Sequence, residues 1–215
     1  SYDNFNACFS RKIRLEHRPI DREPTHLISP CDALLSLYPI EDGLVLPIKQ
    51  SSYSVERLLQ NRQLAREFDG GTCLVFRLCV HHYHRYSFVD DGTAQSPVFI
   101  PGKLHTVRPI ALEQYPVFVE NSRAYTVIDT ANFGKVVQME VGALLVGKIQ
   151  NHSKVGTVCR GEEKGTFLYG GSTIVLLLPK GAAEFPKWMW EATENCREIP
   201  VKLGEALGTA GKAEE

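Results

Sequence analysis

The chain has 215 residues, a length that fits one domain. Hydrophobic residues make up 43% and charged residues 23% of it, which is the composition of a globular protein and not of a disordered one. The 24 Lys and Arg residues balance 25 Asp and Glu residues to a net charge of −1, which argues against binding of duplex nucleic acid through many phosphate contacts. Since no apolar run reaches about 18 residues, the sequence predicts no helix that spans a bilayer.

The six cysteines are scattered, and none forms a Cys-x-x-Cys pair. Disulfide frameworks belong mainly to small secreted domains, and a chain of this length buries enough surface to fold without one. We therefore expect reduced, structural thiols, as in a protein that faces the cytosol. The cysteines are Cys8, Cys31, Cys73, Cys79, Cys159 and Cys196.

The N-terminal part of the chain predicts an arm followed by a hairpin. Polar residues and three prolines dominate the first 30 positions, which favours an extended arm or a wrapped sheet edge. Apolar residues between positions 34 and 48 then flank Glu41-Asp42-Gly43. Because this tripeptide is a turn signal, we expect two short strands joined by a tight turn.

One helix is predicted next. Between Val55 and Phe68, apolar residues recur at the spacing that places them on one face of a helix. Ser52 or Ser54 can cap its start with a side-chain oxygen, and Gly70-Gly71 can end it.

The rest of the chain is predicted to be mostly β. The predicted strands are residues 72–80, 124–129, 135–141, 143–149 and 173–178. The last is a continuous apolar run, which is typical of a strand buried on both faces. The pattern predicts an α+β fold that is predominantly β, an antiparallel sandwich or barrel with one or a few short helices. We expect a single domain over residues 1–208 and a frayed tail over residues 209–215.

Three of the seven histidines crowd into His81-His82-Tyr83-His84. On a strand, His82 and His84 would point to one face and His81 to the other. Neutral imidazoles bind zinc, copper or iron, and they also exchange protons near neutral pH. A metal site would need a further ligand such as His105. The plain alternative is a strand end with solvated or hydrogen-bonded histidines.

The segment Gly170-Gly171-Ser172-Thr173 stands directly before the apolar run. Two glycines leave the backbone free to adopt strained dihedrals, and the serine hydroxyl then lies beside the carbonyl of Gly171. The same residue types are common in turns that start a strand. A phosphate cradle is not favoured, because no helix start and no lysine follow the glycines.

This segment and six others in the same order resemble the phosphatidylserine decarboxylase family in its short bacterial form. The likeness runs from about Phe9 to Gly208, and seven collinear blocks make it specific. The blocks are residues 28–32, 52–59, 83–85, 101–107, 118–121, 133–143 and 161–173.

The resemblance implies a proenzyme that cleaves itself between Gly171 and Ser172, which gives chains of residues 1–171 and 172–215. Attack of the Ser172 hydroxyl on the Gly171 carbonyl, followed by elimination and hydrolysis, leaves a pyruvoyl group in place of the serine. This group is the expected prosthetic group, and its ketone serves as the electron sink that pyridoxal phosphate provides elsewhere. The resemblance implies no metal and no diffusible cofactor.

Three residues match the catalytic set that the resemblance implies: the cleavage serine Ser172, His84 and Asp32. Asp32 closes the Ser-Pro-Cys-Asp block and matches the aspartate of a charge relay. His84 matches the first histidine of the family pattern Tyr-His-x-x-His, which is tied to decarboxylation. The second histidine, which activates the serine in many members, is replaced here by Ser87.

This replacement leaves the base of the cleavage step open. We expect His84 to serve both steps, because an imidazole that titrates near neutral pH can take a proton and later return it. His82 and His105 are the alternatives, and both are also candidates for residues that line the site.

The resemblance implies conversion of phosphatidylserine to phosphatidylethanolamine by a carboxy-lyase of phospholipid biosynthesis. Such an enzyme meets a bilayer, so we expect a peripheral protein at the cytoplasmic face of the cell membrane, with a cytoplasmic location as the alternative. The aromatic residues from Phe185 to Trp190 suit a membrane interface, or equally a core or subunit contact. Family likeness also suggests a dimer of cleaved protomers, and no nucleic-acid partner is expected.

Three other functions stay open at this point. Relatives of the family decarboxylate free amino acids such as tryptophan, so an aromatic amino acid is an alternative substrate. The missing second histidine motivates another alternative, a non-catalytic binding domain on the same scaffold. The last alternative is a metal-dependent β-barrel enzyme that uses the histidine cluster.

Overall fold

The computed structural model describes residues 11–45, 53–103, 117–142, 148–152, 155–168 and 172–211. Within these ranges the chain forms one 11-stranded sheet, the main sheet, and two three-stranded sheets. The strands of the main sheet are β2 (Ala33–Glu41), β3 (Leu44–Val45), β4 (Tyr53–Ser54), β5 (Thr72–Leu78), β7 (Gly92–Ala94), β8 (Val98–Ile100), β9 (Arg123–Thr130), β10 (Lys135–Val141), β12 (Gly156–Val158), β14 (Ser172–Leu178) and β16 (Ile199–Val201). They follow the order β12-β7-β9-β10-β14-β5-β2-β3-β4, with β16 paired to β2 and β8 paired to β9.

Two smaller sheets and several short helices surround the main sheet. The small sheet has the order β11-β13-β6, with β6 (Arg85–Ser87), β11 (Lys148–Asn151) and β13 (Glu163–Leu168). The terminal sheet has the order β1-β17-β15, with β1 (His26–Ile28), β15 (Ala183–Glu184) and β17 (Ala206–Ala210). The helices are the 3-10 helix η1 (Leu15–His17), α2 (Val55–Leu59), α3 (Arg62–Arg66), α5 (Val117–Glu120) and α6 (Lys187–Glu194).

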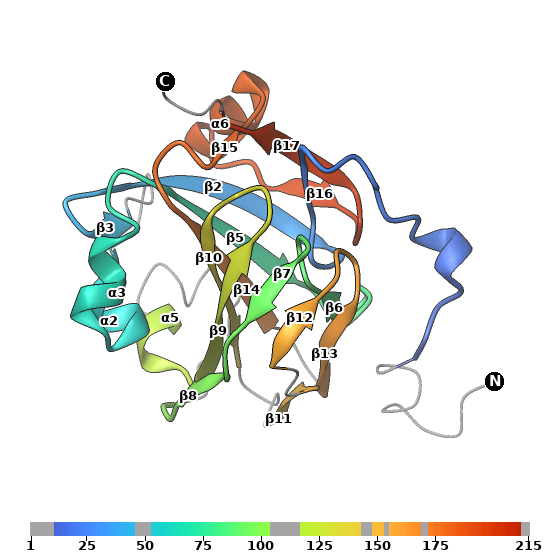
Figure 1. Cartoon of the computed structure of the whole chain (residues 1–215), viewed down its shortest axis with the longest axis horizontal. Helices are drawn as coiled ribbons and strands as arrows, with labels where there is room; N and C mark the ends of the chain where they lie inside the picture. The colour runs from blue at the N-terminus through green and yellow to red at the C-terminus, as the bar shows by residue number, and fades with distance from the viewer. Residues whose placement is uncertain are drawn as a thin grey trace.

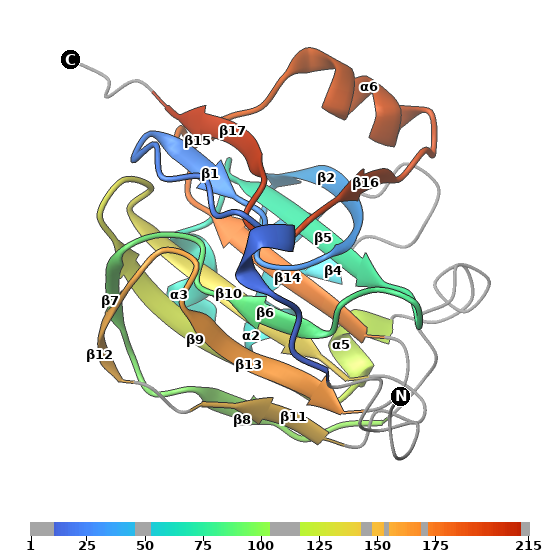
Figure 2. The same cartoon turned by 90° about the vertical axis from the view of Figure 1, so that its right-hand side faces the viewer.

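The main sheet separates two layers (Figure 1). Helices α2 and α3 cover one face, and the small sheet covers the other. The second view agrees, with β6 and β13 in front of β10 and β14 and the two helices behind (Figure 2). The prediction of a mainly antiparallel β fold with few short helices is confirmed in its sandwich form, and the described strands do not close into a barrel.

Strand β14 lies at the centre of the main sheet, between β10 and β5, and every one of its residues is buried. Its alternate side chains enter two different cores because successive residues of a strand point to opposite faces. Ile174 packs in the core shared with the small sheet, which includes Tyr86 and Phe167. Val175 packs in the core shared with α2 and α3. The predicted strand buried on both faces is therefore confirmed.

The predicted hairpin is also confirmed. Glu41 of β2 pairs with Leu44 of β3, and two residues with positive φ connect them, Asp42 (51°) and Gly43 (72°). Asp-Gly is a favoured pair for such a two-residue turn, because both positions need positive φ.

The single helix predicted from residue 55 to residue 68 is two helices. Ser54 accepts a hydrogen bond from the Arg57 N–H and caps α2 as expected. Gln60 then adopts a left-handed conformation, with φ of 50°, and ends α2. Asn61 caps α3 by accepting the Leu64 N–H at 3.0 Å. The prediction of one continuous helix was wrong. The Asn61 side chain accepts a backbone N–H in place of the hydrogen bond that would continue the first helix.

Other features of the described ranges concern the cysteines and the C-terminal region. The five described cysteines are free thiols, while Cys8 lies outside the described residues. Helix α6, which was not predicted, contains Trp188 and Trp190 of the aromatic segment, and β17 continues to Ala210. None of the described helices has both the length and the apolar character needed to cross a bilayer.

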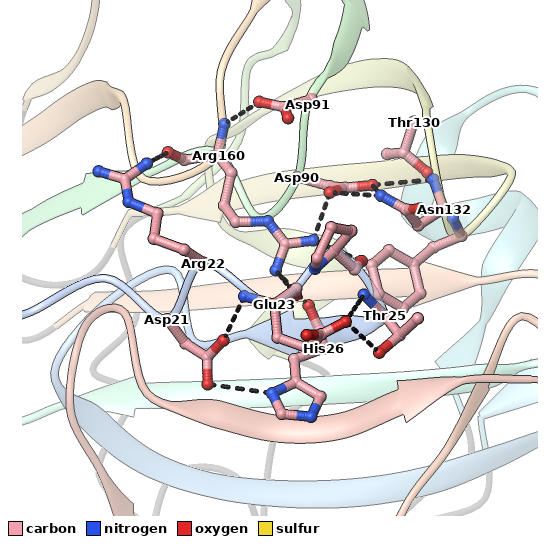
Figure 3. Close-up of polar contacts among 12 residues, drawn as sticks. Asp21, Arg22, Glu23, Thr25, His26, Asp90, Asp91, Thr130, Asn132 and Arg160 are labelled. Carbon is pink, nitrogen blue, oxygen red and sulfur yellow. Dashed lines mark hydrogen bonds and ion pairs between the residues drawn. The ribbon is translucent and has the colours of Figure 1, made fainter.

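A buried arginine, Arg160, fastens the N-terminal arm (residues 11–25) and β1 to the main sheet (Figure 3). Its guanidinium donates to Asp90 Oδ1 at 2.6 Å, and the two side chains are 4% and 0% exposed. The guanidinium also donates hydrogen bonds to the carbonyl oxygens of Glu23 (2.7 Å), Pro24 (2.7 Å) and His26 (2.6 Å). One side chain thus satisfies three backbone carbonyls that the arm could not pair by itself.

Replacing Arg160 with leucine is expected to lower the free energy of unfolding by about 3–5 kcal/mol, because it leaves the buried Asp90 carboxylate without its cation. Urea unfolding measures the loss, and limited proteolysis reports whether the arm is released. The control is Arg22→Ala, since the exposed Arg22 donates one long bond of 3.4 Å to the Arg160 carbonyl. Equal stability of the two variants would contradict this account.

Candidate active site

Ser172, the predicted nucleophile, is the first residue of β14, where it pairs with Leu78 of β5. Its side chain is completely buried, and its Oγ makes no hydrogen bond among the described residues. Because Ser172 and Ile174 share one face of the strand, the hydroxyl points toward the small sheet. Gly171 lies outside the described residues. A buried hydroxyl without a partner is free to act on a neighbouring group once a base takes its proton.

His84 lies directly before β6 and is completely buried. Its carbonyl accepts the Phe167 N–H of β13 at 3.0 Å, so the residue belongs to the edge of the small sheet that Ser172 faces. The ring Nδ1 lies 2.9 Å from the His82 carbonyl oxygen. Since a carbonyl oxygen only accepts, Nδ1 must carry the hydrogen, and the neutral ring keeps its lone pair on the buried Nε2. That nitrogen has the electronic form of a general base.

His81–His84 do not form a strand, and they lie in a turn between β5 and β6. The His82 N–H donates to the Cys79 carbonyl at 2.9 Å, and the Cys79 N–H donates to His82 Nδ1 at 2.9 Å. With one ring nitrogen of His82 and one of His84 occupied by backbone groups, the cluster does not present a row of ligands. Within the described ranges, no three His, Cys, Asp or Glu side chains come close enough to hold a metal ion.

Asp32 lies just before β2, in a pocket of about 870 Å³ that Arg18 and His82 also line. Arg18 binds the carboxylate with two N–H groups, of which Nε lies 2.7 Å from Oδ1, and the Leu203 N–H donates at 3.0 Å. Burial alone would raise the pKa of Asp32, but these hydrogen bonds and the charges of Arg18 and His82 hold it below its usual value. Sequence reasoning missed Arg18, since a polar arm gives no signal of an ion pair with Asp32.

The surroundings of His82 lower the pKa of its imidazole below the usual value. Burial lowers the pKa of its imidazole, and the neighbouring rings and cations, His81 and Arg77, lower it further against the opposing charge of Asp32. The His81 and His82 rings contact each other at 4.3 Å between centroids. His82 and Asp32 line the same pocket. His84 instead lies at the edge of the small sheet that Ser172 faces.

Asp32 and Ser172 stand at the same end of the main sheet. Ser172 pairs with Leu78, and the preceding residue of β5, Arg77, pairs with Leu34 of β2. Strands lie about 4.8 Å apart, so two strand spacings separate the start of β2 from Ser172 by roughly 10 Å. This separation is too long for a direct hydrogen bond, and it is the kind of gap that an imidazole fills between a carboxylate and a hydroxyl. His105, the other candidate, lies outside the described residues.

A further buried ion pair, also missed, joins Glu140 of β10 to Lys164 of β13. Lys164 Nζ lies 2.7 Å from Oε1 and 2.9 Å from Oε2 of Glu140. Burial raises the pKa of Glu140 and lowers that of Lys164, and each partner's charge opposes that effect. The signal in the sequence was Glu140, the one acidic residue within the predicted strand 135–141.

The lowered pKa of Asp32 predicts a pH-dependent contribution to stability. A depressed carboxyl pKa stabilises the fold fully above the usual value of 3.8, and this stabilisation is lost as the pH falls through the lower folded value. At pH 7, Asp32→Asn is expected to lower the free energy of unfolding by about 1–3 kcal/mol. Urea unfolding of both proteins at decreasing pH should show this difference narrowing below pH 3.8; a constant difference would contradict the ion pair.

Comparisons with known proteins identify the family of this chain. The sequence profile of the phosphatidylserine decarboxylase family matches residues 5–209. Phosphatidylserine decarboxylase proenzyme 2 of Clostridium acetobutylicum is 48% identical over 207 residues, which cover 96% of this chain and 71% of that protein. The phosphatidylserine decarboxylase proenzyme of Clostridium novyi is 41% identical over 97% of this chain and 72% of its own length. The chain belongs to the phosphatidylserine decarboxylase family.

Proposed function

We propose that this chain is a carboxy-lyase that converts phosphatidylserine to phosphatidylethanolamine after it cleaves its own backbone between Gly171 and Ser172. Family membership supports the reaction. The observation that carries the proposal is the buried, unpartnered hydroxyl of Ser172 at the start of the central strand. The relatives are named as phosphatidylserine decarboxylase proenzymes, so neither a free amino acid as substrate nor a non-catalytic role is favoured.

The cleavage step uses only groups of this chain and one water. The Ser172 Oγ attacks the Gly171 carbonyl carbon, and the bond from that carbon to the Ser172 nitrogen breaks to give an ester and a free amine. Loss of the Ser172 α-proton expels the Gly171 carboxylate and leaves an enamine. Hydrolysis of this enamine, in its imine form, releases ammonia and leaves a pyruvoyl group. A base must take the Oγ proton first, because a neutral hydroxyl is a weak nucleophile.

The position of Ser172 fits a pyruvoyl group. Its surroundings are buried, the original hydroxyl has no hydrogen bond among the described residues, and Leu78 pairs with it across β5. A ketone at this place would replace a group of similar size without leaving a buried donor unpaired. When present, the group supplies an electrophilic carbonyl for the substrate amine and an acceptor for the electrons left by CO₂.

His84 is proposed as the proton carrier of both steps. Its Nε2 can take the Ser172 Oγ proton during cleavage and can later return a proton to the substrate carbon that has lost CO₂. The His82 carbonyl fixes the ring in the tautomer that leaves Nε2 basic. Asp32 is proposed as the relay carboxylate, with Arg18 holding it ionised and oriented.

A phospholipid substrate implies contact with a membrane surface, and we propose peripheral association at the cytoplasmic face of the cell membrane. Trp188 of α6 supports this, since 56% of its surface is exposed and tryptophan suits the bilayer interface. Trp190 instead packs against Phe185, with 6.2 Å between ring centroids. A dimer of cleaved protomers is proposed from family likeness alone.

Ser172→Ala is expected to abolish cleavage and decarboxylation together. Intact-mass analysis of the wild type should show two chains, with the smaller one lighter by one ammonia than residues 172–215 with an unmodified serine. The wild type should release CO₂ from phosphatidylserine in mixed micelles. Thr173→Val is the matched control, because its hydroxyl is also buried and unpartnered among the described residues but points to the opposite face. Cleavage in Ser172→Ala, or an uncut wild type that releases CO₂, would overturn the proposal.

Two histidine variants separate the candidate bases. His84→Gln is expected to slow cleavage by about 10²- to 10⁴-fold, the usual contribution of a general base. His82→Gln should have a smaller effect, because His82 lies with Asp32 in the pocket. Time courses of cleavage after refolding measure both rates. A larger loss in His82→Gln would transfer the base role to that residue.

A further inference from the structure

The Glu140–Lys164 pair is the centre of a buried hydrogen-bonded network. Besides the two bonds from Lys164, the Glu140 carboxylate accepts the Asn151 side-chain N–H at 3.0 Å. The Asn151 Oδ1 in turn accepts the Tyr86 hydroxyl at 3.0 Å and Lys164 Nζ at 3.2 Å. The Glu140 and Lys164 side chains are 0% and 3% exposed. Each of the four side chains in this network is thus held by a hydrogen bond to at least one of the others.

This network reaches the face of the main sheet that carries Ser172. Glu140 pairs with Ile174 across β10 and β14, and residues paired in this way point to the same face. Ser172 precedes Ile174 by two residues and shares that face, so Glu140 is its diagonal neighbour. Such neighbours lie about 7–8 Å apart, within reach of a long side chain.

The other end of the network reaches β6, the strand that directly follows His84. Tyr86 follows His84 by two residues, belongs to β6, and packs its ring against Phe167 at 4.9 Å. The network therefore joins β10 of the main sheet to β13, β11 and β6 of the small sheet. It is a cross-link between the sheet that carries the nucleophile and the sheet that carries the proposed base.

Stability alone does not require a buried ion pair at this place. Removing two charges from water is costly, and well-packed apolar residues of similar volume commonly replace a buried ion pair without loss of stability. Directional hydrogen bonds, in contrast, specify one relative position of two sheets in a way that apolar contacts do not.

We propose that Glu140, Lys164, Asn151 and Tyr86 are positioning residues that hold His84 in register with Ser172. The inference rests on the proposed function, since it assigns these residues to the cleavage and decarboxylation steps. The four side chains act through His84, and none of them is assigned a proton transfer.

The test is a double variant, Glu140→Leu with Lys164→Met, which replaces the pair by apolar side chains of similar size. The thermal midpoint should stay the same or rise. Cleavage should nevertheless slow by about 10- to 100-fold, the effect of a small misplacement of reacting groups. In the fraction that matures, kcat should fall and KM for phosphatidylserine should stay unchanged, a split that a purely structural role would not produce.

A second variant restores the hydrogen bonds without the charges. Glu140→Gln with Lys164→Gln should cleave within about threefold of the wild type, because the amides can bond to each other and to Asn151. The control is Glu67→Gln with Lys135→Gln, which removes the partly exposed ion pair between α3 and β10 and should leave cleavage unchanged.

The outcomes separate the two proposals. An uncleaved, inactive wild type would refute the proposed function before any variant is compared. A wild type that cleaves, together with a Leu/Met variant that cleaves equally fast, would overturn the positioning role alone. A Gln/Gln variant as slow as the Leu/Met variant would also overturn it, because hydrogen bonds would then not be the active element.

Discussion

The burial of Ser172 at the start of a strand that is paired on both edges is the constraint on which the site depends. Strand β14 pairs with β10 and β5, so its backbone cannot shift without breaking two ladders. The alternation of side chains then directs Ser172 into the space beneath the small sheet. The hydroxyl of the proposed nucleophile is thus held by a strand that is hydrogen-bonded on both edges, which favours precise attack on a neighbouring group.

Buried charges serve two different parts of this molecule. Arg160 binds Asp90 and three carbonyls of the arm, and it thereby determines where the N-terminal arm runs. That arm carries Arg18, which holds Asp32. The position of the proposed relay carboxylate, Asp32, therefore depends indirectly on Arg160, which binds the arm close to β1. The pair of Glu140 and Lys164 connects the two sheets instead.

The sequence predicted the elements whose signals are local. The apolar run of β14 predicted a strand buried on both faces, and Asp42-Gly43 predicted the hairpin turn, because each pattern depends on neighbouring residues. The break between α2 and α3 was missed because the left-handed conformation of Gln60 leaves the apolar spacing intact. The histidine turn was missed since nothing local in the sequence shows that the Cys79 backbone binds His82.

Contacts between distant residues could not be read from one sequence. Arg18 and Asp32 are separated by 14 residues, and Glu140 and Lys164 by 24, so each pair comes together only in the folded chain. The resemblance identified Ser172, His84 and Asp32 as candidates without placing them. Their roles stay predictions, while the structure adds the groups that surround them.

The described residues after Gly171 take part in two of the three sheets and form one helix. They contribute β14 and β16 to the main sheet, β15 and β17 to the terminal sheet, and α6 on β2. A nick before Ser172 would cut one covalent link and leave these ladders in place. The two polypeptides would then stay associated through these strand pairings after the backbone is cut. They would separate only when the protein unfolds.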